Sequence, residues 1–171
     1  MIPERKLLAR MTNKIYNLQE LKGIVEKLKK EKKKIVLANG CFDILHVGHV
    51  RYLEEAKKLG DILIVAINSD ESVRKIKGEK RPIVPGKERA EIISALKVVD
   101  FVIIFDELDV RKLLLELKPH IQVKGTDYTE ESVPERDVVL SYGGSVKITG
   151  DSKNHSSKDI ISTILEKFCK K

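Results

Sequence analysis

The sequence predicts an α/β fold: a doubly wound, five-stranded parallel sheet with helices on both faces. Short apolar runs of strand length alternate along the chain with segments of helical periodicity. The strand runs are continuously apolar, which is typical of parallel strands covered on both faces. Polar, glycine-containing loops follow these runs, at the sheet edge where α/β proteins bind ligands.

Five apolar runs are the expected strands. They lie at about residues 34–39, 62–67, 101–104, 121–123 and 146–148. Breaker residues mark some of their limits: Gly60 ends the segment before the second run, and Pro119 ends the one before the fourth.

The first helix is expected at about residues 17–33. Asn17 and Glu20 have the spacing of a capping box, in which each side chain bonds the backbone amide of the other. An apolar stripe at helical spacing follows: Leu18, Leu21, Val25 and Leu28. Further helices are expected at about residues 50–59, 71–76, 90–96 and 110–117, from residue 134, and at 156–168.

The length of 171 residues suits one domain with a sizeable core. We expect a loosely ordered lead-in at residues 1–16 and a single domain at 17–171. No apolar run approaches the roughly 20 residues that span a bilayer, and none at the start resembles a secretion signal, so we expect a cytoplasmic protein without a membrane partner. The two cysteines, Cys41 and Cys169, are not expected to form a disulfide there.

The net charge of +7 is concentrated at the start of the chain, where residues 1–34 hold 11 Lys/Arg against 4 Asp/Glu. A basic segment of this kind is either a solvated helix face or a patch for nucleic acid. No aromatic side chains interleave with these lysines to stack bases. We therefore expect no nucleic-acid partner, and a nucleic-acid-binding module is the rival outside the enzymes.

The most informative motif lies between the first strand and the next helix. His46 and His49 flank Gly48 there, and the amides at the start of a helix carry partial positive charge. Imidazoles so placed suit a triphosphate and the charge that develops at its α-phosphorus, so both histidines are candidate catalytic residues. Gly48 lets the backbone approach a ligand. The backbone amides of 40–42 (Gly40, Cys41 and Phe42) are expected to face the α-phosphate.

Other polar residues gather after the remaining strands. Ser156 and Ser157 open the last helix, where hydroxyls and free amides form an anion site. After the fourth strand, Lys124, Gly125 and Asp127 are expected to contact the nucleotide, Gly125 by close backbone approach and Asp127 by accepting from a ribose or base.

An enzyme that joins two phosphorylated substrates also needs cations to neutralise their phosphates. Lys77, Arg81 and Arg89 cluster in and after the central polar loop and are the candidates. Asp43 is expected to position the histidine loop. Zinc ligation by the histidines and Cys41 is a rival interpretation, although no further Cys or His has metal-like spacing. Neither G-x-x-x-x-G-K-[ST] nor G-x-G-x-x-G is present.

Several stretches resemble the cytidylyltransferase-like nucleotidyltransferases, and more closely the adenylyltransferase domain of the bacterial ADP-heptose synthesis enzyme. The superfamily motif is Gly40-x-Phe42-Asp43 with His46-x-Gly48-His49 and a serine pair. The heptose branch is indicated by the stretches at 39–46 (Asn-Gly-Cys-Phe-Asp-Ile-Leu-His), 58–61 (Lys-Leu-Gly-Asp), 66–70 (Ala-Ile-Asn-Ser-Asp), 77–82 (Lys-Gly with Arg-Pro) and 123–128 (Val-Lys-Gly-x-Asp-Tyr).

The resemblance implies a Rossmann-like nucleotidyltransferase fold and transfer of AMP from ATP, with Mg²⁺, to D-glycero-β-D-manno-heptose 1-phosphate. The products would be ADP-heptose, for the lipopolysaccharide core, and pyrophosphate. It also implies a separate sugar kinase that supplies the sugar 1-phosphate, and a homodimer. Metal ligands from the protein are not expected. The rivals are a cytidylyltransferase for glycerol 3-phosphate or another phosphorylated acceptor, and an FAD synthetase.

The chain departs from the family pattern near its last motif. Lys158 stands where a third hydroxyl is usual, His155 replaces a smaller or apolar residue, and Lys153 lies where an Arg-Thr lead is common. These changes concern the contacts to the triphosphate and leave the expected reaction unchanged.

Overall fold

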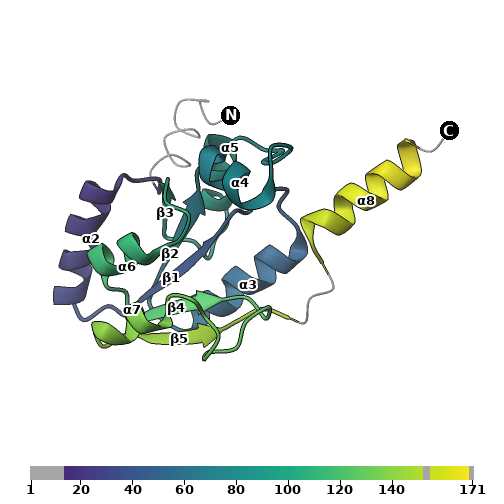
Figure 1. Cartoon of the computed structure of the whole chain (residues 1–171). Coiled ribbons are helices and arrows are strands. Elements are labelled where there is room, and N and C mark those ends of the chain that lie inside the picture. The colour runs from purple at the N-terminus through teal and green to yellow at the C-terminus, as the bar shows by residue number, and fades with distance from the viewer. Residues whose placement is uncertain (1–13, 152–154, 170–171) are drawn as a thin grey trace.

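A computed structural model of the chain, which describes residues 14–151 and 155–169, confirms the predicted fold. Figure 1 shows a five-stranded sheet with helices on both of its faces. All strand pairs are parallel, in the order β3-β2-β1-β4-β5. The strands are β1 (Ile35–Gly40), β2 (Ile62–Asn68), β3 (Phe101–Phe105), β4 (Ile121–Lys124) and β5 (Ser145–Ile148).

Seven helices are described, and their bounds differ from the expected ones mainly at the ends. They are α2 (Leu18–Lys30), α3 (Val47–Lys58), α4 (Asp70–Lys77), α5 (Gly86–Ser94), α6 (Arg111–Leu117), α7 (Arg136–Ser141) and α8 (Ser157–Phe168). None of them is long and apolar enough to cross a membrane.

The central strand β1 pairs with β2 and β4, so the strand order reverses there. Its ladder with β2 runs from Ile35 to Gly40, whereas its ladder with β4 ends at Ala38. Strands β1 and β4 therefore separate at their carboxyl ends. A switch point of this kind leaves room for a ligand at the edge of an open α/β sheet.

Alternating strand residues build a core on each face of the sheet. Leu37 faces the cluster under α2, α6 and α7, and its neighbour Val36 faces the cluster under α3 and α5. Both side chains are fully buried. The sheet is thus covered on both sides, as its continuous apolar runs predict.

The basic first helix belongs to the domain. Its capping box is present: the Asn17 side chain accepts from the amide of Glu20, and the Glu20 carboxylate accepts from the amide of Asn17. Leu21 and Val25 are buried in the core. Lys29 Nζ donates to two carbonyl oxygens at the end of α6. Part of the positive charge therefore serves packing within the domain.

The expected lead-in needs a correction at its end. Residues 14–16 join the sheet edge instead of lying loose: Ile15 forms a parallel bridge with Val102, and Tyr16 packs edge-on against Phe101 at 5.6 Å between ring centroids. Residues 1–13 lie outside the described part of the chain. The ordered domain thus begins no later than residue 14.

The last helix leaves the body of the domain. Its first turn lies near α3, and its far end projects outward (Figure 1). None of its described residues is buried, and Phe168 is 80% exposed. Its contribution to the site therefore comes from its first turn.

Truncating Leu21 should destabilise the whole domain, because its side chain fills the core under α2. We expect Leu21→Ala to lower the free energy of unfolding by about 2–5 kcal/mol in urea denaturation. Lys27→Ala, on the exposed face of the same helix, is the matched control and should change it by less than about 0.5 kcal/mol. Equal, small effects would show that α2 does not pack on the sheet.

Candidate active site

A cavity of about 670 Å³ lies at the carboxyl edge of the sheet, where β1 and β4 separate. It brings together nearly all the residues predicted from the sequence. Its wall includes Gly40, Cys41, Phe42, Asp43, His46, Gly48, His49, Lys77, Arg81, Lys124, Gly125, Asp127, His155, Ser156, Ser157 and Lys158. Arg89 is the predicted residue that the wall does not include. Lys153 lies outside the described residues.

The two histidines stack on each other at the start of α3. Their ring centroids are 3.8 Å apart and the planes meet at 23°. Phe42 packs against the far ring, with its centroid 5.2 Å from that of His49. The Nδ1 atoms of both rings are buried and lack a hydrogen-bond partner among the described residues. This leaves Nε2 as the ring atom that meets a ligand.

Both histidines are poor bases in this setting. Burial and the neighbouring His46 lower the pKa of His49 to about 4, and burial with the nearby His155 lowers the pKa of His46. The rings are therefore neutral near pH 7, and each can donate one hydrogen bond. A polyphosphate in the cavity would shift both pKa values upward, because opposite charge favours the protonated ring.

A buried carboxylate holds the loop that carries these rings. Asp43 is only 2% exposed, and its oxygens accept from the amides of Ile83 and Val84 at 2.9–3.0 Å and from Arg81 Nε at 2.5 Å. Burial alone would raise the pKa of Asp43, but the two amides and the guanidinium together hold it below its ordinary value.

The loop needs this support because its backbone is strained. Phe42 and Ile44, on either side of Asp43, adopt φ angles of 50° and 57°. Non-glycine residues avoid this left-handed region at a cost of roughly 1–2 kcal/mol each. The bonds to Asp43 offset that cost and join the histidine loop to the segment before α5.

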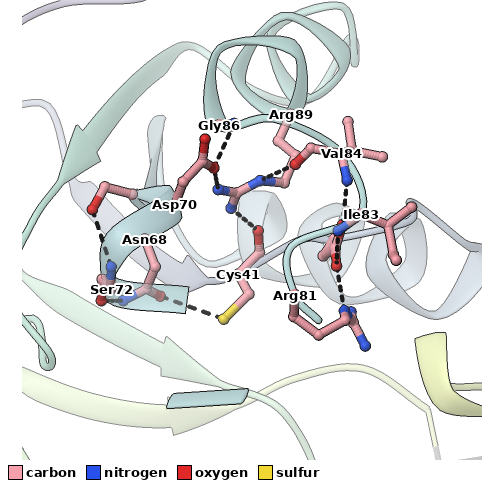
Figure 2. A network of polar contacts seen from close by, with 11 residues as sticks. Cys41, Asn68, Asp70, Ser72, Arg81, Ile83, Val84, Gly86 and Arg89 are labelled. Carbon is pink, nitrogen blue, oxygen red and sulfur yellow. Dashed lines mark hydrogen bonds and ion pairs between the residues drawn. The ribbon is translucent and has the colours of Figure 1, made fainter. Parts of the chain in front are cut away.

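Arg89 supports the same loop and is not placed to bind phosphate. Its guanidinium is fully buried and donates to the carbonyl oxygens of Val84 (2.9 Å) and Cys41 (2.5 Å) and to the Asp70 carboxylate (2.7 Å), as Figure 2 shows. The expected phosphate contact is therefore corrected to a bracing role. The sequence pattern could have predicted this burial, because Arg89 lies four residues before the buried Ile93 and thus on the same face of the helix.

The start of α8 faces the start of α3. Ser157 Oγ donates to the carbonyl oxygen of Asp43 at 2.5 Å, and Ser156 caps α8 by accepting from the amide of Asp159. A Cβ on Gly48 would lie 3.1 Å from the His46 ring and 3.4 Å from Cβ of His155. A larger residue at position 48 would therefore press on the His46 ring, within the start of α3 itself. Two positive helix N-termini thus converge on one cavity.

Cationic side chains also line the wall. Lys77 and Arg81 come from the end of α4 and the loop that follows it, and Lys124 from the end of β4. Arg81 bonds Asp43 through Nε, and no bond joins its terminal nitrogens to another of the described residues, which leaves them available to an anion. A polyanion that enters the cavity would therefore meet the positive charge of these side chains as well as the helix N-termini.

Cys41 lies on the wall as a free thiol. Burial raises its pKa, although nearby Lys77, Arg89 and Arg81 act in the opposite direction. A protonated thiol is a poor metal ligand. In the described part of the chain, no group of three His, Cys, Asp or Glu side chains is arranged to hold a metal ion.

Sequence reasoning missed several polar residues of the wall, among them Asn39, Asn68, Thr149 and Glu135. Glu135 is 3% exposed and pairs with Lys124, with 3.3 Å between Oε1 and Nζ. Asn39 could have been predicted, because it is the polar residue that ends the apolar run of β1. A polar residue at the carboxyl end of a central parallel strand lies at the edge of the sheet where ligands bind.

The family model for cytidylyltransferase-like proteins matches residues 37–165. The chain belongs to this family of nucleotidyltransferases. The bifunctional protein HldE of Geobacter metallireducens is 52% identical over 155 residues, and that of Geobacter sulfurreducens is 46% identical over 155 residues. Each match covers 91% of this chain and 32% of the relative, so the chain spans about a third of their length.

Two solved structures share the fold. The lipopolysaccharide core biosynthesis protein from Thermoplasma volcanium has a TM-score of 0.60 and 40% identity, over 72% of this chain and 99% of that protein. Pantoate-beta-alanine ligase from Francisella tularensis, solved with β,γ-ATP and β-alanine, has a TM-score of 0.55 at 18% identity, over 92% of this chain and 79% of that protein. The second likeness supports the nucleotidyltransferase-type fold alone.

Removing the Arg89 guanidinium should destabilise the protein, because two carbonyl oxygens and Asp70 lose their donor. We expect Arg89→Met to lower the free energy of unfolding by about 3 kcal/mol or more. Lys77→Met, a cation on the exposed wall, is the control and should leave stability within about 0.5 kcal/mol of wild type. Denaturant titration of both variants measures these free energies. An Arg89→Met variant as stable as wild type would contradict the bracing role.

The lowered pKa of His49 should make stability depend on pH. The folded pKa of about 4 lies below the unfolded value near 6.5, so protons favour the unfolded chain. Stability is complete above pH 6.5 and should fall as the pH drops towards 4, by up to about 1.4 kcal/mol per pH unit. Denaturation series for wild type and His49→Gln measure this, and a wild-type slope no steeper than that of the variant would count against it.

Proposed function

We propose that the protein transfers AMP from ATP to a sugar 1-phosphate, D-glycero-β-D-manno-heptose 1-phosphate, releasing pyrophosphate and forming ADP-heptose for lipopolysaccharide core synthesis. The observation that carries the proposal is the convergence of two helix N-termini on the stacked histidines, beside a wall of three cations. The motifs that resemble the ADP-heptose enzyme and the HldE relatives support the choice of substrates.

The proposed mechanism is direct in-line attack. A phosphate oxygen of the sugar attacks the α-phosphorus of ATP, the bond from that phosphorus to the bridging oxygen breaks, and pyrophosphate leaves. A phosphate monoester is already nucleophilic, so neither a general base nor a covalent intermediate is required. Catalysis then consists of positioning and charge stabilisation.

Each part of the wall has a role in this proposal. His46 and His49 donate through Nε2 to the oxygens of the α-phosphorus as their charge grows. The amides of 40–42 and Gly48 hold the α-phosphate, and the first turn of α8 with Ser156 and Ser157 holds the leaving pyrophosphate. Lys77 and Arg81 neutralise the acceptor phosphate, and the 124–127 loop holds the nucleoside.

We propose that Mg²⁺ enters the site bound to ATP. The reaction is proposed to take place in the cytoplasm. The described residues fit a protein-held ion poorly, because they contain no suitable ligand cluster and the Asp43 carboxylate already has three donors. Oxygens of the triphosphate are the natural ligands for this ion. A separate sugar kinase would supply the acceptor.

The substrate assignment is tested by pyrophosphate release with ATP, CTP and GTP, each with heptose 1-phosphate, glycerol 3-phosphate or FMN as acceptor. We expect release with ATP and heptose 1-phosphate only. CTP with glycerol 3-phosphate would favour the cytidylyltransferase, and ATP with FMN the FAD synthetase. No release, together with salt-sensitive RNA binding, would favour the nucleic-acid module.

Removing either imidazole should abolish most turnover while leaving the fold intact. His46→Ala and His49→Ala are each expected to lower kcat by about 100- to 1000-fold, the cost of losing one donor to a transition-state oxyanion. Circular dichroism and urea denaturation check the fold. His120→Ala, a change at a histidine outside the cavity wall, should retain turnover and serves as the control. Activity near wild type in either site variant would refute the assignment.

A further inference from the structure

We infer that Glu135 and Asn39 form the part of the cavity that recognises hydroxyl groups of the acceptor, so that the enzyme selects a polyhydroxylated phosphate ester. This inference rests on the proposed function, which it extends by assigning the acceptor side of the cavity. Neither residue has a part in the transfer mechanism above.

The two residues lie where β1 and β4 separate, on the side of the sheet away from the histidines. Asn39 follows Leu37 with the same strand parity, so it points to the face covered by α6 and α7. Glu135 is the residue before α7 and pairs with Lys124 at the end of β4. Both line the same cavity as the histidines. The cavity therefore has a phosphate half under α3 and α8 and a second half under α7.

The second half contains hydrogen-bond acceptors without donors. Glu135 Oε1 accepts from Lys124, but its Oε2 is buried and has no partner among the described residues. Asn39 Oδ1 is also buried and unpartnered there. A buried acceptor left unpaired costs roughly 1–3 kcal/mol, more for a charged group. A ligand that supplies donors would remove this cost.

Hydroxyl groups are the donors that fit. A phosphate would be repelled by the Glu135 carboxylate, which places the acceptor's phosphate near Lys77 and Arg81 instead. A cationic ligand would compete with Lys124, which already occupies the first oxygen of Glu135. A sugar carries several neutral donors and leaves the Lys124 pair intact. Gln122 and Tyr142 also hold unpartnered polar atoms, but neither belongs to the cavity wall.

Selectivity against simpler acceptors follows from the same chemistry. A site built to bond hydroxyl groups rejects analogues that lack them, because its buried polar atoms are then left unpaired. The Glu135 carboxylate would form a stronger hydrogen bond to a hydroxyl group than the Asn39 amide, since hydrogen bonds to charged groups are stronger than those between neutral groups. Glu135 is therefore the residue whose neutralisation should change acceptor use most.

The test compares Glu135→Gln with wild type and with Glu130→Gln. The first change keeps the size of the side chain and removes the charge. Glu130 lies in the same connection, has a half-exposed side chain that pairs with Lys147, and is outside the cavity wall, so it is a matched control. The readouts are kcat and KM for heptose 1-phosphate, the Kd of ATP by calorimetry without acceptor, and the melting temperature.

For Glu135→Gln we expect KM for the sugar phosphate to rise about 10- to 100-fold, as for loss of a charged hydrogen bond. Because Glu135 pairs with Lys124 of the nucleoside-binding loop, the Kd of ATP should change too, but much less than this KM. Glu130→Gln should match wild type throughout. Asn39→Ala should raise the same KM more modestly, which keeps the test valid if Glu135→Gln folds poorly.

Three results would overturn the inference: an unchanged KM in both Glu135→Gln and Asn39→Ala, a loss of ATP affinity equal to the loss of acceptor affinity, or a lower melting temperature with an unchanged KM. The proposed function fails separately if wild type does not use heptose 1-phosphate. If it then uses glycerol 3-phosphate or FMN, the inference stands only if Glu135→Gln raises the KM for that hydroxylated acceptor. If wild type uses no acceptor, both fall.

Discussion

The site depends on one buried carboxylate. Asp43 ties the histidine loop to the segment before α5 through two backbone amides and Arg81, and its own carbonyl oxygen accepts from Ser157 at the start of α8. Three parts of the chain that are far apart in sequence thus meet at one residue. The left-handed backbone on both sides of it shows that the loop would not hold this shape unaided. Arg89 supports the same loop by donating to the carbonyl oxygen of Cys41 (Figure 2).

This arrangement suits the stabilisation of phosphate charge by fixed donors. The stacked histidines are neutral near pH 7, the helix N-termini supply partial positive charge, and full charges come from the lysines and the arginine of the wall. Donors that are already in place need no reorganisation as charge develops, which is where such sites gain most of their effect. The wall at Asn39 and Glu135 differs, since it holds two buried oxygens that have no partner among the described residues.

The fold and most of the cavity wall could be predicted from the sequence, because both follow from local patterns. Apolar runs separated by helical segments define the sheet, and polar residues after its strands gather at one edge. The bracing by Arg89 was not predicted, since its partners Cys41 and Val84 are set by tertiary packing. The pairing of Glu135 with Lys124 escaped prediction for the same reason. Residues 14–16 were expected to be loose because a short strand bridge leaves little periodicity in the sequence.

Stereochemistry at the transferred phosphorus tests the central claim, that the protein positions two substrates and contributes no nucleophile. The measurement uses ATP with a chiral α-phosphorothioate and follows the configuration of the nucleotide-sugar product by ³¹P NMR. A single in-line displacement inverts the configuration. Retention would require two displacements through a covalent enzyme intermediate, with His46, His49 or Cys41 as the nearest candidates on the wall, and would contradict the account.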